Sequence, residues 1–225
     1  MSIEKVDDFA TRLARLDACA ISDALDQLGL PPSVTGLGSR AAKGRVSGSI
    51  VTVKLAAGRP PEGTTPRHLC TTAIDMAAPG QVIVVEQRTG VECAGWGGIL
   101  SNAARVRGVS GVIVEGLARD VDEAADIGFR VYARGSTART ARGRIYETGT
   151  GEPITVGDVT VSTGDWVVAD CSGAAFVPAV RVADVLAAAE RIAAREAGMT
   201  KAVLAGHPVS TVMGGDYEHL LETFE

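Results

Sequence analysis

Two adjacent residues, Arg119 and Asp120, are the pair in this sequence best suited to chemistry on a small acid. They come shortly after an apolar run, 109–114, that predicts a strand buried on both faces. Open α/β sheets tend to bind ligands at the carboxyl ends of such strands. An arginine can hold a carboxylate through two parallel hydrogen bonds, and an aspartate can hold a hard cation such as Mg²⁺ that keeps several waters. The pair therefore predicts a site for a 2-oxo acid; the alternative is a solvated ion pair at the end of a loop.

A glycine-rich turn precedes this pair in the chain and offers a second set of polar groups. Gly95, Gly97 and Gly98 come before a stretch with the pattern of an amphipathic helix, which Gly108 is expected to end. Backbone N–H groups at the start of a helix favour an anion. A second, shorter helix is expected over 121–127, so its start is another place where an anionic group could bind.

Length and composition limit the class of protein. The chain has 225 residues, of which 46% are hydrophobic and only 4% aromatic, so we expect a core of Ala, Val, Leu and Ile. The net charge of −5 does not indicate a nucleic-acid-binding surface. The first ten residues are polar and acidic, unlike a signal peptide, and no apolar run approaches the length that spans a bilayer. We therefore expect a cytoplasmic protein that acts on neither nucleic acid nor membrane.

The four cysteines indicate neither a disulfide framework nor a zinc site. They are widely spaced and form no CxxC pair, so isolated buried thiols are the better interpretation. They are Cys19, Cys70, Cys93 and Cys171.

Short β-like runs alternate with a few helical stretches, which predicts a single α/β domain over 1–225 with mixed sheets flanked by helices. Asp17 or Ser22 is expected to cap a helix that ends at Gly29. The basic stretch 136–144 is expected to be a loop, either solvated or in contact with an anion. The further helices are expected at 6–16, 68–78, 181–199 and 217–224, and the further strands at 44–55, 81–86, 129–133, 153–156, 159–161, 165–170 and 174–180.

Five segments form a recognisable set: GGIL at 97–100, RGVSG at 107–111, EGLARD at 115–120, GFRVYARG at 128–135 and GDWVVAD at 164–170. Together they resemble the RraA-like family over roughly residues 15–197, which leaves 200–225 as a helical tail. The members of that family include 4-hydroxy-4-methyl-2-oxoglutarate/4-carboxy-4-hydroxy-2-oxoadipate aldolases and the protein regulator of ribonuclease E activity. The resemblance implies a swivelling β/β/α fold, a homotrimer or homohexamer, and active sites between subunits.

The resemblance also implies an activity and its residues. Aldolase members use Mg²⁺ or Mn²⁺ to cleave a 2-oxo acid, or to decarboxylate oxaloacetate, through a pyruvate enolate. Arg119 is then expected to grip the substrate and stabilise the enolate, and Asp120 to hold the metal. Glu196 is expected to reach the water ligands of the neighbouring subunit's metal. The substrate-binding turn is expected to comprise Gly97, Gly98, Ile99 and Leu100.

One position departs from the family's pattern. The aldolases carry an acidic residue twenty-one positions before the arginine, and this sequence has Gly98 there. Another acid could take its place, with Glu123 better placed than Glu92 or Glu115 because it lies one helical turn beyond Asp120. The departure leaves three hypotheses open: a metal-dependent carbon–carbon lyase, a different lyase, dehydratase or isomerase on the same scaffold, and a non-catalytic protein regulator.

Overall fold

The computed structural model describes residues 3–64 and 67–214, and side chains from residue 8 onward. Its main feature is a nine-stranded mixed sheet, in which the order of the principal strands is β1-β6-β5-β3-β2-β10-β11. Parallel pairing joins β2 (Val46–Ala57), β3 (Val82–Glu86), β5 (Gly111–Ala118) and β6 (Val131–Ser136). The expected α/β fold with mixed sheets and flanking helices is therefore confirmed.

The remaining strands extend this parallel centre. β4 (Ala94–Trp96) pairs in parallel with β5, and β7 (Ile145–Thr150) pairs antiparallel with β2. The antiparallel edges are formed by β1 (Gly38–Ser39), β10 (Trp166–Asp170) and β11 (Gly173–Val177). A separate hairpin consists of β8 (Ile154–Val156) and β9 (Val159–Val161).

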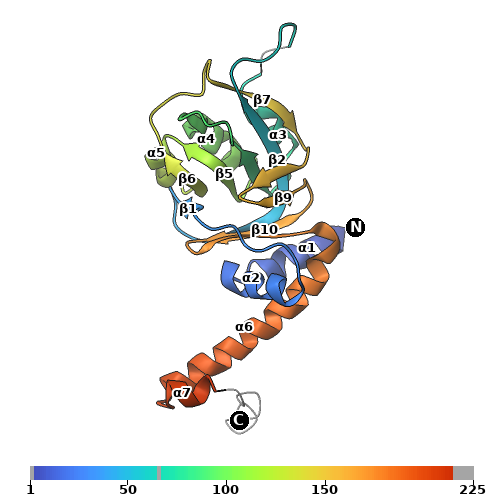
Figure 1. Ribbon diagram of the computed structural model, residues 1–225, viewed down its shortest axis with the longest axis vertical. Coiled ribbons are helices and arrows are strands. Elements are labelled where there is room, and N and C mark those ends of the chain that lie inside the picture. The colour runs from blue at the N-terminus through green and yellow to red at the C-terminus, as the bar shows by residue number, and fades with distance from the viewer. Residues whose placement is uncertain (1–2, 65–66, 215–225) are drawn as a thin grey trace.

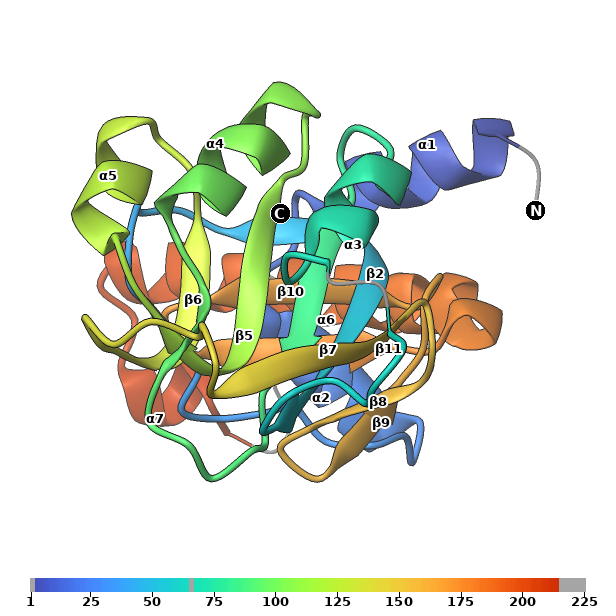
Figure 2. The ribbon, with the colours of Figure 1, turned by 90° about the horizontal axis from the view of Figure 1, so that it is seen from above.

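Helices cover the sheet on two opposite sides (Figure 1). On one side lie α3 (Thr71–Met76), α4 (Gly98–Val106) and α5 (Val121–Asp126), and Figure 2 shows α4 beside α5. On the other side lie α1 (Ile3–Leu13), α2 (Ala18–Gln27), the short η1 (Ala179–Arg181), α6 (Val182–Leu204) and α7 (Val209–Val212). The C-terminal half of α6 runs away from the sheets toward α7.

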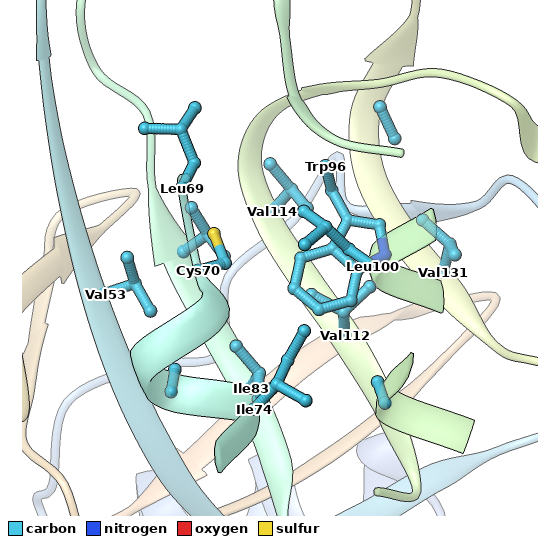
Figure 3. Packing of buried hydrophobic residues seen from close by; sticks show 14 of the residues in the cluster. Val53, Leu69, Cys70, Ile74, Ile83, Trp96, Leu100, Val112, Val114 and Val131 are labelled. Atoms are coloured by element: carbon cyan, nitrogen blue, oxygen red, sulfur yellow. The ribbon is translucent and has the colours of Figure 1, made fainter. Parts of the chain in front are cut away.

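Three apolar clusters make up most of the core. The first lies between the parallel strands and α3, α4 and α5, and Figure 3 shows its members Trp96, Leu100 and Val112. The second lies between the parallel strands and the antiparallel strands β8 to β11. Ile113 of β5 and Phe176 of β11, for example, belong to this one cluster. The third joins β10 and β11 to α1, α2 and α6. Aliphatic side chains dominate all three, as the composition predicts.

The start of α2 shows how local sequence sets an element. Asp17, rather than Ser22, is the N-cap: its Oδ1 accepts the Ala20 N–H at 2.8 Å. Asp170, at the end of β10, accepts the Ala18 N–H at 2.9 Å, so a second carboxylate also satisfies this helix start. Gly29 follows the helix with φ +61°, which confirms the expected stop.

Some expectations need correction. The strand expected over 109–114 is β5 and continues to Ala118, because Leu117 and Ala118 pair with β4 and β6. All four cysteines are free thiols, but Cys19 and Cys171 are exposed, so only two are buried. The helix expected over 217–224 lies outside the described residues. In the part of the chain that the structure describes, no helix is both long and apolar enough to cross a membrane.

Candidate active site

Arg119 and Asp120 lie where β5 ends, next to the start of α4. The Arg119 N–H donates to the Trp96 carbonyl oxygen at 3.0 Å, which ties the end of β5 to the end of β4. Asp120 has φ 55° and ψ 36°, and Cys70 is the one other described non-glycine residue with a positive φ. A non-glycine residue in the left-handed region costs roughly 1–2 kcal/mol, so neighbouring contacts must hold Asp120 in place.

The Asp120 carboxylate joins both halves of the site. Its Oδ2 accepts the Gly98 N–H at 3.0 Å and the Arg119 Nε–H at 3.2 Å. The carboxylate therefore caps α4 from outside that helix, where a negative charge interacts favourably with the helix N-terminus. The Arg119 and Asp120 side chains are 39% and 38% exposed, so a ligand can reach both.

Gly97 allows this close approach. A Cβ at this position would lie 3.0 Å from Asp120 Oδ2 and 3.3 Å from Arg119 Nε. The backbone of Gly97 is extended, with φ −154°, so its conformation does not itself require glycine. Space for the ion pair is the reason for a glycine here.

The turn expected to bind substrate is partly occupied by the protein itself. The Gly98 N–H is already bonded to Asp120, whereas the N–H groups of Ile99 and Leu100 lie in the first turn of α4 and have no acceptor within the helix. The Ile99 side chain is 83% exposed and the Leu100 side chain is buried. The structure thus brings Arg119 and Asp120 to the predicted turn.

The three candidate acids are in different surroundings. Glu92 forms an ion pair with Arg139 at 2.9 Å, and the largely buried Glu115 forms one with Arg134 at 2.8 Å. Glu123 instead lies against the start of α4, where its Oε1 accepts the Asn102 Nδ2–H at 2.8 Å.

Glu196 is far from this constellation within one chain. It is exposed on the C-terminal half of α6, and Figure 1 shows α6 and α4 on opposite sides of the sheets. One chain therefore does not bring Glu196 to Asp120, and a role for it in the site requires a second copy.

The structure reveals a positioning residue that the sequence did not indicate, the buried Gln87. Its Oε1 accepts the Leu117 N–H at 3.2 Å, and its Nε2 donates to the Cys93 carbonyl oxygen at 2.5 Å. A Cβ on Gly95 or Gly116 would lie 2.5 or 2.6 Å from Gln87 Oε1, so the two glycines form the slot for this amide. The signal in the sequence is a single amide, Gln87, that follows the strand-like run 82–86. Two later glycines, Gly95 and Gly116, lie in strands, where no turn requires a glycine.

We expect Gln87→Met to destabilise the fold by about 1–3 kcal/mol for each backbone group left without a partner. The substitution keeps the length of the side chain but removes the hydrogen bonds that the amide makes to Leu117 of β5 and to Cys93, the residue before β4. Urea denaturation measures the change. The matched control is Gln27→Met, the same change at an exposed position of α2, expected within about 0.5 kcal/mol of the unchanged protein. Equal stability of the two variants would contradict the role of Gln87.

The donor atoms at this site suit a hydrated hard cation. Mg²⁺ typically takes one or two carboxylates and keeps several waters. Asp120 Oδ1 accepts no hydrogen bond from any residue that the structure describes, and the Glu123 carboxylate is exposed. Within the same residues, no three His, Cys, Asp or Glu side chains converge as a metal cluster. The residues thus fit a cation bound largely through water rather than a fully protein-bound one.

Comparison with known proteins identifies the scaffold. The sequence model of the RraA-like family, described as Aldolase/RraA, matches residues 18–176. The chain belongs to the RraA-like family. This RraA-like chain is 28% identical over 200 residues to a Halalkalibacterium halodurans protein named "Putative 4-hydroxy-4-methyl-2-oxoglutarate aldolase", a match that covers 87% of this chain and 89% of that protein. It is 26% identical over 175 residues to protein DlpA of Legionella pneumophila; that match covers 78% of this chain but spans only 28% of DlpA.

Solved structures agree with the family's fold. This RraA-like chain superposes on an uncharacterized protein from Pseudomonas syringae pv. tomato with a TM-score of 0.82 at 26% identity, covering 92% of this chain and 98% of that one. It also superposes on RraAS2 of Streptomyces coelicolor, an unusual member of the RNase ES inhibitor RraA protein family. That TM-score is 0.73 at 22% identity, with 82% and 92% coverage. The resemblance to this family is therefore confirmed.

Proposed function

We propose that this RraA-like chain is a divalent-metal-dependent carbon–carbon lyase that releases pyruvate from a small 2-oxo acid. The observation that carries the proposal is the arrangement of Arg119 and Asp120, which one hydrogen bond to the Gly98 N–H places at the start of α4. The names of the aldolase-like relatives support the same reaction class.

The site can hold the common part of such substrates, a carboxylate next to a ketone. Arg119 uses its Nε–H in the ion pair with Asp120, and this leaves the four N–H groups of its terminal nitrogens for the substrate. The free N–H groups of Ile99 and Leu100 point from the start of α4, where an anion is favoured. These two sources of donors can bind the carboxylate and the 2-oxo oxygen together.

The same donors favour cleavage when charge develops. In aldol cleavage, the C4 hydroxyl loses its proton, the C3–C4 bond breaks, and its electron pair moves to the 2-oxo oxygen to give a pyruvate enolate. Protonation of the enolate at C3 then yields pyruvate, while C4 leaves as a carbonyl. Arg119 stabilises the negative charge that grows on the oxygen. Asp120 would hold a divalent cation, which would supply Lewis acidity for the same charge.

Decarboxylation of oxaloacetate needs the same enolate, with CO₂ in place of the carbonyl product. One site can therefore catalyse both reactions.

A complete site is proposed to form between copies of the chain. Glu196 lies on a helix that extends away from its own sheets, so it can approach Asp120 only from a neighbouring subunit. A homotrimer, or a homohexamer built from trimers, would supply such a neighbour, and Glu196 would then help to hold the cation through water.

Pyruvate release tests the proposal. We expect pyruvate from 4-hydroxy-4-methyl-2-oxoglutarate, oxaloacetate or both, measured by coupling to lactate dehydrogenase, with Mg²⁺ or Mn²⁺ present and not after EDTA treatment. Release that EDTA leaves unchanged would contradict the metal dependence. No release by the folded protein with metal would overturn the proposal and favour another reaction on this scaffold, or a regulator like the RNase inhibitors among the structural relatives.

A further inference from the structure

Position 98 holds a glycine for a reason that the backbone does not provide. Gly98 is the first residue of α4 and is not among the glycines with a positive φ, so its conformation is open to any residue. Something else must explain why no side chain occurs here.

The Glu123 carboxylate explains it. A Cβ on Gly98 would lie 2.0 Å from Glu123 Oε2 and 2.6 Å from Glu123 Cδ, far inside van der Waals contact. The end of the Glu123 side chain therefore occupies the space into which a side chain at position 98 would project. Gly98 and Glu123 are a matched pair: the carboxylate can lie there only because the glycine has no Cβ.

Asn102 holds the carboxylate in this space. Its Nδ2 donates to Glu123 Oε1 at 2.8 Å and to the Gly98 carbonyl oxygen at 3.0 Å. The amide thus bridges α5 to the first turn of α4 and limits the positions open to an otherwise exposed side chain.

The position also places Glu123 in the site of Asp120. Asp120 is the N-cap of α5 and Glu123 lies in the first turn of that helix, and both side chains reach Gly98. One carboxylate bonds the Gly98 N–H and the other covers its Cα. We propose that Glu123 is the second carboxylate of the divalent-cation site at Asp120. Its side chain extends from α5 into the space that a side chain at position 98 would otherwise occupy. The inference rests on the proposed function in so far as that function requires a cation at Asp120.

The affinity of the protein for Mn²⁺ tests this inference without any substrate. Electron paramagnetic resonance of free Mn²⁺ gives the dissociation constant for each full-length variant. We expect Glu123→Gln, which keeps the size of the side chain, to weaken Mn²⁺ binding about 10- to 100-fold, the usual effect of losing an outer-shell group. The control Asp122→Asn removes one negative charge at the preceding position of α5. We expect this variant to bind Mn²⁺ nearly as tightly as the unchanged protein does.

A second pair of variants tests the coupling between the two positions. Gly98→Ala changes no charge, yet its Cβ must displace the Glu123 carboxylate, so we expect it to weaken Mn²⁺ binding as Glu123→Gln does. The double variant Gly98→Asp with Glu123→Ala places a new carboxylate in the same space, but attached to α4 instead of α5. We expect this variant to recover most of the Mn²⁺ affinity. This relocation separates a cation-binding role from a structural one, because a merely structural role of Glu123 would not be rescued.

The possible failures are distinguishable. Equal Mn²⁺ affinity of Glu123→Gln and the unchanged protein would overturn the inference and leave the lyase proposal intact. Weakened Mn²⁺ binding in a protein that releases no pyruvate would support the inference and overturn the lyase proposal. A protein that binds no Mn²⁺ would overturn the inference directly.

Discussion

Replacing Arg119 with alanine should lower kcat/KM for pyruvate release about 10²–10³-fold, the usual effect of removing one preorganised donor to a developing oxyanion. Little stability should be lost, because the Arg119–Asp120 pair is more than one-third exposed and exposed ion pairs contribute at most about 1 kcal/mol. The side chain is therefore expected to matter for the reaction and hardly at all for the fold.

Arg119→Lys refines this expectation. Lysine keeps the positive charge but lacks the planar fork that can bond Asp120 through Nε and a substrate through its terminal nitrogens. We expect only partial recovery of kcat/KM. Full activity of the lysine variant would show that charge alone suffices and would remove the argument for a bidentate grip.

The measurement is the coupled pyruvate assay at saturating Mn²⁺, together with thermal denaturation of each variant. Arg105→Ala is the matched control, since Arg105 is an exposed arginine near the other end of α4. It should retain full activity. If Arg119→Ala also retained activity, the site would have to be sought elsewhere, for instance at the basic stretch 136–144.

The order of helices and strands over residues 95–135 could be predicted from the sequence, because a local signal marks the end of each helix there. Gly108 and Gly128 have positive φ values, +77° and +69°, and each follows a helix at the expected place. Arg119 and Asp120 could be placed at a strand end because the apolar run before them is too continuous for a half-exposed strand. Such signals depend only on neighbouring residues in the chain and not on which helices and strands pack together.

The rest of the site depends on contacts between segments far apart in the chain. Periodicity placed Glu123 one turn after Asp120, but the meeting of its carboxylate with Gly98 depends on how α5 packs against α4. Gln87 was missed for the same reason, because its partners at Cys93 and Leu117 come together only when β4 pairs with β5. A single sequence contains the residues of such contacts but not their distances.

The largest loss of stability should follow removal of the Trp96 side chain, which packs in the core beneath the turn between β4 and α4. Trp96 is 1% exposed, stacks on Phe129 with ring centroids 6.3 Å apart, and packs in the cluster shown in Figure 3. Its Nε1–H donates to Ser101 Oγ at 2.9 Å, so it also joins the end of β4 to α4. We expect Trp96→Ala to lower the free energy of unfolding by about 3–5 kcal/mol, measured by urea denaturation.

A comparison of two tryptophan-to-phenylalanine variants isolates the hydrogen bond within that loss. Trp166 is equally buried, at 1% exposed, but its Nε1–H has no hydrogen-bond partner among the described residues. Both substitutions shrink a buried ring, yet Trp96→Phe breaks a hydrogen bond whereas Trp166→Phe removes an unsatisfied donor. Trp96→Phe should therefore be the more destabilising by about 1 kcal/mol or more. Equal losses would mean that Trp96 acts through its volume alone, and that the bond to Ser101 contributes nothing to holding α4 against the strand that leads into the site.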